Sequence, residues 1–113
     1  MFDHSGIANM HELLLALERQ SEDRVLMKYM SGTQVVEVTA PEFFREVRKC
    51  AAYLASLGLS GKHIGIMGPN RVDWMVHLCA AYEIGAVTVL MAPDLNGEDI
   101  TARAAQTDLE GIL

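Results

Sequence analysis

Residues 63–91 read HIGIMGPNRVDWMVHLCAAYEIGAVTVLM, and this stretch decides the fold class. Its first five and last six residues are short apolar runs, which are typical of strands buried on both faces of a parallel sheet. Residues 71–84, between them, make a helix that is apolar nearly all round, so we expect other elements to cover most of its sides. Asn70, with Asp73, is expected to cap the start of this helix, and Gly85 is expected to end it. The stretch therefore predicts a strand–helix–strand unit.

The chain continues with a second unit of the same kind. Asn96 and Asp99 predict the cap of a helix over residues 98–106, and a further strand is expected over residues 109–113. A succession of strand, helix, strand, helix and strand is typical of a right-handed parallel α/β layer. The second half of the chain is therefore expected to form a parallel sheet with helices.

The first half of the chain predicts a helix followed by a hairpin. Asn9 is expected to cap the helix, and residues 1–9 are expected to be disordered. Two β-rich runs, residues 24–30 and 34–38, are separated by three residues that include Gly32. A connection of that length with a glycine is typical of a β-hairpin.

A second helix follows the hairpin directly. Thr39 is expected to cap it, Pro41 fits its first turn because no N–H is needed there, and Gly58 is expected to end it. An apolar stripe at helical spacing marks the face that we expect to be buried. The stripe consists of Phe43, Val47, Cys50, Ala51, Leu54 and Leu57.

Charge and hydropathy exclude several classes of function. Nine Lys and Arg against fifteen Asp and Glu give a net charge of −6, and no basic cluster is present, so nucleic acid is not an expected partner. No apolar run is long enough for a transmembrane segment, and the N-terminus does not resemble a secretory signal. Two cysteines cannot form a disulfide framework and suit a reducing compartment, which predicts a cytoplasmic protein.

The apolar content is high for a chain of 113 residues. With glycine counted and tyrosine left out, roughly 56% of the residues are apolar, against about 45–50% in average domains. The chain also ends on the apolar pair Ile112 and Leu113. These features predict that residues 1–113 are a fragment of a larger domain whose partner is the remainder of that chain. The isolated fragment is then expected to self-associate through an exposed sheet edge or the apolar helix.

One turn lies where α/β proteins often hold phosphates. Residues 65–70 (GIMGPN) connect a strand to a helix, but they lack the G-x-G-x-x-G spacing, and Pro69 removes an N–H group. We therefore interpret them as a tight turn before a capped helix. Residues 31–33 are interpreted as a hairpin turn. Glu98 and Asp99 are interpreted as first-turn residues that favour the helix dipole and not as an acid/base pair.

The remaining chemistry-bearing side chains also have structural interpretations. The spacing of the histidines is not that of a metal site; they are His4, His11, His63 and His77. His77 is interpreted as a hydrogen-bonded packing residue, and Cys50 and Cys79 as small buried hydrophobes. Most methionines are interpreted as core residues, with a soft binding surface as the alternative; they are Met10, Met27, Met30, Met67, Met75 and Met91. No catalytic, cofactor-binding or metal-binding residue is assigned.

Four short motifs, taken in order, resemble the N-terminal segment of the acyl-CoA synthetases and related AMP-forming, adenylate-forming ligases. They are TAPEF at 39–43, AAYLASLG at 51–58, GKHIGIMGPNRVDW at 61–74 and AAYEIGAVTVLM at 80–91. The resemblance runs from Met10 to Leu113. Ala40, Lys62 and the position of Pro93 depart from the family pattern, so the motifs indicate the family and leave the subfamily open.

The resemblance implies an activity for the complete enzyme. Such an enzyme uses ATP and Mg²⁺ to convert a carboxylic acid to an acyl-adenylate, and coenzyme A then displaces AMP to give an acyl-CoA thioester. The motif from Asn70 to Trp74 is most similar to ligases of fatty or aryl acids, which implies fatty acid metabolism, although amino-acid-adenylating relatives share it. The acyl substrate itself is not defined by this segment.

The resemblance also implies that the fragment is architectural. The family's phosphate loop, Mg²⁺ carboxylate and catalytic lysine lie later in such chains, so the fragment is expected to be inactive and to hold no cofactor itself. Gly68, Asn70 and Trp74 would then be turn, cap and packing groups. The fold expected is α/β, with an N-terminal helix and β-hairpin followed by a partial parallel sheet with helices. The alternative is a self-contained α/β nucleotide-binding or protein-interaction module without catalysis.

Overall fold

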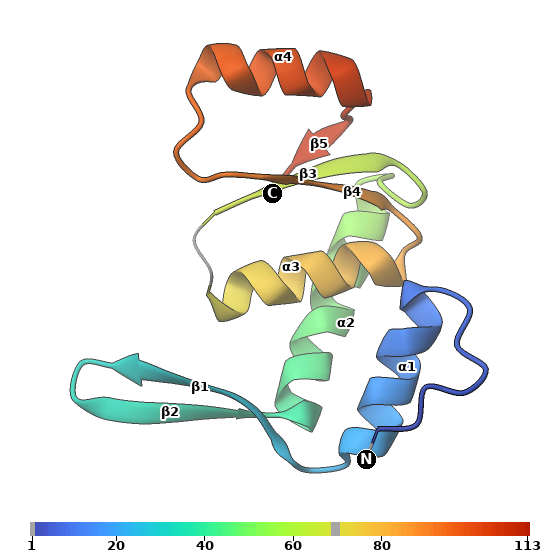
Figure 1. The fold of residues 1–113 in the computed structure, drawn as a ribbon, viewed down its shortest axis with the longest axis vertical. Helices are drawn as coiled ribbons and strands as arrows, with labels where there is room; N and C mark the ends of the chain where they lie inside the picture. Colours follow the sequence, from blue (N-terminus) through green and yellow to red (C-terminus); the bar gives the residue numbers. More distant parts are fainter. Residues whose placement is uncertain (1, 69–70) are drawn as a thin grey trace.

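The computed structural model describes residues 2–68 and 71–113, and Figure 1 shows how their elements are arranged. In chain order the elements are α1 (Met10–Ser21), β1 (Val25–Ser31), β2 (Gln34–Thr39), α2 (Ala40–Ser56), β3 (His63–Met67), α3 (Val72–Glu83), β4 (Val87–Met91), α4 (Gly97–Thr107) and β5 (Gly111–Ile112). The β1–β2 hairpin extends away from the layer of α1, α2 and α3 (Figure 1). This confirms the expected fold class.

The second half of the chain forms a small parallel sheet in the order β4–β3–β5. In the register, His63 lies beside Val87, Met67 lies beside Met91, and Gly65 lies beside Ile112. Strand β3 is central, and Ile64 and Ile66 are its most buried side chains, with 0% and 1% of their surface exposed. Both strand–helix–strand units predicted from the sequence are therefore present and parallel.

Strand β4 differs from its prediction. Its apolar run was expected to be buried on both faces, but Val87 is 50% exposed and Leu90 is 56% exposed. The reason is topological: β4 lies at the edge of the three-stranded sheet and pairs with β3 on one side. An apolar strand becomes buried on both faces only where neighbouring strands and helices cover it. The prediction of two-sided burial is therefore wrong for β4.

The hairpin turn is one residue shorter than expected. Ser31 belongs to β1 and pairs with Gln34, so Gly32 and Thr33 alone form the loop. Gly32 has a φ of +63°, the positive value that two-residue hairpin turns require. A two-residue turn of this kind matches the twist of the flanking strands, which explains why the pairing continues as far as Ser31.

Three of the predicted helix caps are present. The side chains of Asn9, Thr39 and Asn96 accept backbone N–H groups three residues later, at 2.9, 3.4 and 2.8 Å. The remaining helix differs, because α3 begins at Val72 with Arg71 in an extended conformation at its N-cap and no side-chain cap bond. The predicted cap residue Asn70 lies outside the described residues.

The segment before α1 is tied to that helix. Asp3 donates its N–H to the amide oxygen of Gln20 at 2.7 Å, and the amide nitrogen of Gln20 donates back to the carbonyl of Asp3 at 2.7 Å. The carboxylate of Asp3 also accepts a hydrogen bond from the N–H of Ser5, and this bond lowers the pKa of Asp3. The disorder expected for residues 1–9 stays a prediction.

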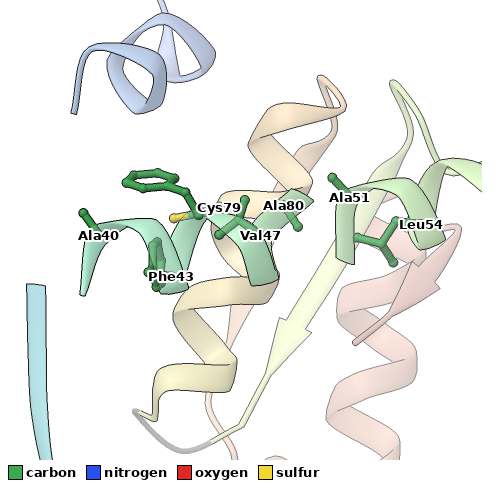
Figure 2. Close-up of a cluster of buried hydrophobic side chains, with 8 residues drawn as sticks. Ala40, Phe43, Val47, Ala51, Leu54, Cys79 and Ala80 are labelled. Carbon is green, nitrogen blue, oxygen red and sulfur yellow. The ribbon is translucent and has the colours of Figure 1, made fainter. Parts of the chain in front are cut away.

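The larger part of the core lies between α2 and α3. Figure 2 shows buried side chains of this core; Phe43, Val47, Ala51 and Leu54 of α2 are spaced three or four residues apart, and Cys79 and Ala80 belong to α3. Of the predicted stripe, Phe43, Val47, Ala51 and Leu54 are at most 5% exposed. Cys50 is only half-buried, and Leu57 is 56% exposed. Leu57 is exposed because it is the C-cap residue, where the chain leaves the helix.

Helix α3 is covered on most sides, as expected from its composition. It packs against α2, α1, β3 and β4, and Asp73 is its one exposed residue.

Two of the methionines that were predicted to be core residues are exposed. Met91 is buried, but Met10 is 43% exposed and Met30 is 62% exposed, so these two are not core residues.

Candidate functional site

The carboxyl ends of β3 and β4 form the first candidate site. Helix α3 follows β3 on one side of the sheet and α4 follows β4 on the other side (Figure 1). Where neighbouring parallel strands send their connections to opposite faces, a crevice opens beyond the strand ends, and α/β proteins commonly bind ligands there. The described residues at these strand ends are Met67 at the end of β3, Gly68 after it, and Ala92 after β4.

Gly68 has a backbone conformation that explains the residue type. Its φ is +152°, a value that residues with a Cβ atom rarely adopt. A Cβ added at this position would lie 3.8 Å from Cδ1 of Trp74. The glycine thus turns the chain sharply at the end of β3, and Trp74 packs close behind it. This geometry agrees with the interpretation of residues 65–70 as a tight turn, of which Pro69 and Asn70 lie outside the described residues.

A groove lies beside this turn, between strand β1 and the first turns of α3. Its volume is about 460 Å³, and it carries two cationic side chains, Lys28 and Arg71. Lys28 is paired with Glu37 across the hairpin at 3.7 Å, so part of its charge is already balanced. The other lining residues are Met27, Tyr29, Val72, Trp74 and Met75. The groove is therefore largely apolar, with positive charge at its wall.

A second, apolar cavity lies deeper, between α1, β1, α2 and α3. Its volume is about 280 Å³, and no charged side chain lines it. Met27 and Met75 line both this cavity and the groove, so the two spaces are neighbours. Its lining residues are Met10, Leu14, Leu17, Leu26, Met27, Phe43, Met75, Leu78, Cys79 and Tyr82. With a lining that is mostly aliphatic and aromatic and carries no charge, the cavity offers mainly packing space.

The two cysteines are not equivalent. Burial raises the pKa of the Cys79 thiol to about 11, with a smaller contribution from the Glu83 carboxylate. Burial also raises the pKa of Cys50, which is half-buried. A thiol with a raised pKa holds less of the nucleophilic thiolate at neutral pH. The interpretation as an unreactive buried hydrophobe therefore fits Cys79 better than Cys50.

We expect the thiols to react at different rates. With iodoacetamide at about pH 8, Cys50 should be alkylated at least about tenfold faster than Cys79, because Cys79 has less thiolate and less access. Mass spectrometry of timed samples measures both rates in one protein. In denaturant the rates should become similar, which is the control. Equal rates in the folded protein would contradict the burial of Cys79.

The described residues hold no constellation for metal binding. Among residues 2–68 and 71–113, no group of three or more His, Cys, Asp and Glu side chains could hold a metal ion. The ring of His63 has a structural contact, because its Nδ1 donates to the carbonyl of Thr107 at 2.6 Å and ties β3 to α4. Within the same part of the chain, no helix is long and apolar enough to span a bilayer.

Comparison with known families decides the relationship of this chain. A family model described as "AMP-binding enzyme" matches residues 15–113. The chain belongs to the AMP-binding enzyme family. As an AMP-binding enzyme segment, it is 30% identical over 83 residues to the medium-chain acyl-CoA ligase ACSF2, mitochondrial, of Danio rerio. That match covers 73% of this chain and 13% of the zebrafish protein, so the chain spans a small part of the relative's length.

Solved structures share the fold of this AMP-binding segment. The crystal structure of IdnL1 matches with a TM-score of 0.83 and 20% identity, over 97% of this chain and 23% of IdnL1. The N-terminal subdomain of Klebsiella oxytoca NpsA matches with a TM-score of 0.83 and 16% identity, over 95% of this chain and 27% of that chain. The inhibitor-bound N-terminal domain of FACL13 from Mycobacterium tuberculosis matches with a TM-score of 0.78 and 20% identity, over 94% and 26%.

The groove and the cavity were not predicted from the sequence. Their walls join segments that are far apart in the chain, such as Met27 on β1 and Met75 on α3. Periodicity reports which face of an element is apolar, but it does not report which two faces leave a space between them. The exposure of Met10 beside the cavity fits the alternative of a soft surface better than that of core packing.

Proposed function

We propose that this chain is the architectural first part of an ATP-dependent acid–thiol ligase. In the complete enzyme, a carboxylate oxygen would attack the α-phosphorus of ATP and release pyrophosphate, and the thiolate of coenzyme A would then attack the acyl carbon and release AMP. The observation that carries the proposal is the family match over residues 15–113, together with four motifs in the family's order. The name of the zebrafish relative supports a fatty acid as the acid, and hence a role in fatty acid metabolism.

The structural role of the segment follows from its packing. Helices α2 and α3 supply a core in which Phe43, Val47 and Leu54 are nearly inaccessible, and Ile64 and Ile66 join the sheet to α3. Because the resemblance places the phosphate loop, the Mg²⁺ carboxylate and the catalytic lysine later in such chains, ATP, Mg²⁺ and coenzyme A would be held by the remainder of the parent chain. We propose a cytoplasmic location, although the zebrafish relative is named as mitochondrial.

An exchange assay tests the architectural role. We expect the isolated chain to catalyse no ATP–pyrophosphate exchange with fatty or aryl acids, because the resemblance places the phosphate loop, the Mg²⁺ carboxylate and the catalytic lysine in the remainder of the parent chain. In a second arm, the chain is mixed with the zebrafish ligase from which the matched stretch has been removed. Exchange that returns on mixing would support the proposal. Robust exchange by the isolated chain would overturn its expected inactivity. If the mixture shows no exchange while the full-length zebrafish ligase, assayed as a control, is active, that result would count against the architectural role.

A second candidate is a self-contained nucleotide-binding module without catalysis. It is favoured by the turn at Gly68, at the carboxyl end of β3, and by the groove with Lys28 and Arg71. Titration calorimetry with ATP and AMP separates the two candidates. A dissociation constant in the micromolar range would favour the module, whereas the architectural role predicts no measurable heat of binding.

A further inference from the structure

The apolar cavity between α1, β1, α2 and α3 is larger than close packing explains. Its volume is about 280 Å³, whereas a water molecule occupies about 30 Å³ and protein interiors hold few voids larger than that. Phe43 and Cys79, two of its walls that appear in Figure 2, are 2% and 6% exposed. Of the ten lining residues, Met10 alone is classed as exposed. Buried and half-buried side chains of this chain itself therefore make most of the enclosure.

Water has few polar partners in this space. A buried water molecule typically makes about two to four hydrogen bonds to protein groups. The lining side chains offer one thiol, Cys79, and one phenol, Tyr82, whose hydroxyl already accepts a hydrogen bond from Thr88 at 3.4 Å. The thiol is neutral at physiological pH, because burial raises the pKa of Cys79 to about 11. A preformed space with such walls is suited to an apolar molecule and not to water.

Methionine side chains form the borders of the cavity. Met27 and Met75 line both the cavity and the groove beside Trp74, and Met10 lines both the cavity and a hollow next to Gly85. Methionine is unbranched and has three rotatable side-chain bonds, so it adapts to the shape of a neighbour, and its sulfur contacts aromatic rings favourably. Borders of this kind can admit a small molecule and then close around an aromatic ring.

We propose that this cavity is a binding site for a small, uncharged molecule that carries an aromatic ring. The size follows from the volume: a dry apolar cavity of about 150 Å³ holds benzene, so 280 Å³ leaves room for a ring with alkyl substituents. The lack of charge follows from the walls, because no charged side chain lines the cavity and an unpaired ion in apolar surroundings is strongly disfavoured. The site requires no adenylation, so this proposal and the proposed ligase role can fail separately.

Methyl NMR of the full 113-residue chain tests the proposal, with toluene as the probe. Isotope-labelled methionine methyl groups report the position of the ligand, because the ring current of a bound aromatic molecule shifts nearby methyl signals. We expect the signals of Met10, Met27 and Met75 to shift as toluene is added, with a dissociation constant on the order of 0.1–1 mM. The signals of Met30 and Met91, which do not line the cavity, should stay unchanged.

Benzoate is the matched ligand control, because it carries a carboxylate in place of the methyl group of toluene. At the same concentration it should shift none of these signals, since the cavity walls offer no partner for its charge. If benzoate shifted Met27 and Met75 as strongly as toluene, the ligand would be an anion held in the groove with Lys28 and Arg71, and the proposal would be wrong. Unchanged methionine signals in saturated toluene would also overturn it.

A cavity-filling variant tests the location from the protein side. Leu17 is a half-buried residue of α1 that lines the cavity, and Leu17→Phe should weaken toluene binding at least about tenfold because the new ring takes the space of the ligand. Leu15→Phe is the matched control, because it adds the same ring on the same helix at a residue that is 46% exposed and does not line the cavity. Its affinity for toluene should equal that of the wild type.

Alkylation of Cys79 in the wild type keeps the test decisive if Leu17→Phe perturbs folding. Toluene at about ten times its dissociation constant should slow the reaction of Cys79 with iodoacetamide about tenfold, because about one chain in eleven then has an empty cavity. The rate at Cys50, which does not line the cavity, should not change. An unchanged rate at Cys79, or equal toluene binding by the folded Leu17→Phe and Leu15→Phe variants, would contradict the proposed site.

Discussion

Replacing Phe43 by alanine is expected to lower the free energy of unfolding by about 3–5 kcal/mol. The ring is 2% exposed and meets Phe44 edge-on, with 5.2 Å between the ring centroids and 84° between the ring planes. It also lines the apolar cavity of about 280 Å³, so its loss would enlarge an existing void. Small domains have only about 5–15 kcal/mol of stability, so the variant should be close to unfolding at room temperature.

Urea unfolding followed by circular dichroism measures this loss, at protein concentrations low enough to avoid self-association. Tyr53→Ala is the matched control, because it truncates an aromatic residue on the same helix that is 64% exposed. The control should change the free energy of unfolding by less than about 0.5 kcal/mol. Similar losses for both variants would mean that the α2 face toward α3 is not the main core.

The elements were predictable where their signals are local. Asn9, Thr39 and Asn96 each mark a helix start, because a short polar side chain satisfies a backbone N–H within three residues. Gly58 and Gly85 mark helix ends, with φ values of +78° and +71°. None of these features depends on the rest of the fold. The sequence alone therefore predicted which segments are helices and which are strands.

Burial was less predictable because it depends on neighbours. The runs at β3 and β4 are similarly apolar, yet Ile64 is fully buried and Leu90 is 56% exposed. The difference is the position of each strand in the order β4–β3–β5, which no local pattern encodes. The same holds for Met30, which lies far along a hairpin that extends from the body of the protein (Figure 1). Its side chain is therefore exposed, at 62%, and does not pack in the core.

The family assignment depended on motifs and not on a site. The four motifs lie on structural features, such as the Thr39 cap and the turn at Gly68, and these features now have a physical explanation in the fold. The groove was not predicted from the sequence, because its walls come from β1 and α3, which lie more than forty residues apart in the chain. Motifs that preserve a framework can thus indicate a family even where the segment carries no catalytic group.

Replacing Gly65 by valine is expected to lower the free energy of unfolding by about 1–3 kcal/mol. Gly65 lies buried on β3, and a Cβ added there would lie 2.5 Å from Cε of Met91 and 3.0 Å from Cδ1 of Leu109. The methionine end is flexible and can move, but the two γ-methyl groups of valine also need space. The third neighbour is Ile112, whose Cγ1 would lie 3.4 Å from the new Cβ. Valine should therefore push β5 away from the sheet.

Hydrogen exchange separates this local effect from a general loss of stability. The N–H of Leu113 donates to the carbonyl of Gly65 at 2.9 Å, so its exchange should accelerate more in Gly65→Val than that of amides in α2. Gly111→Ala is the matched control on β5, because its Cβ would meet Leu59 at ordinary distances of 3.6 and 3.7 Å. That variant should be neutral or slightly stabilising, since alanine restricts the unfolded chain. If Gly111→Ala were as harmful as Gly65→Val, loss of glycine itself and not crowding against Met91 and Leu109 would be the cause.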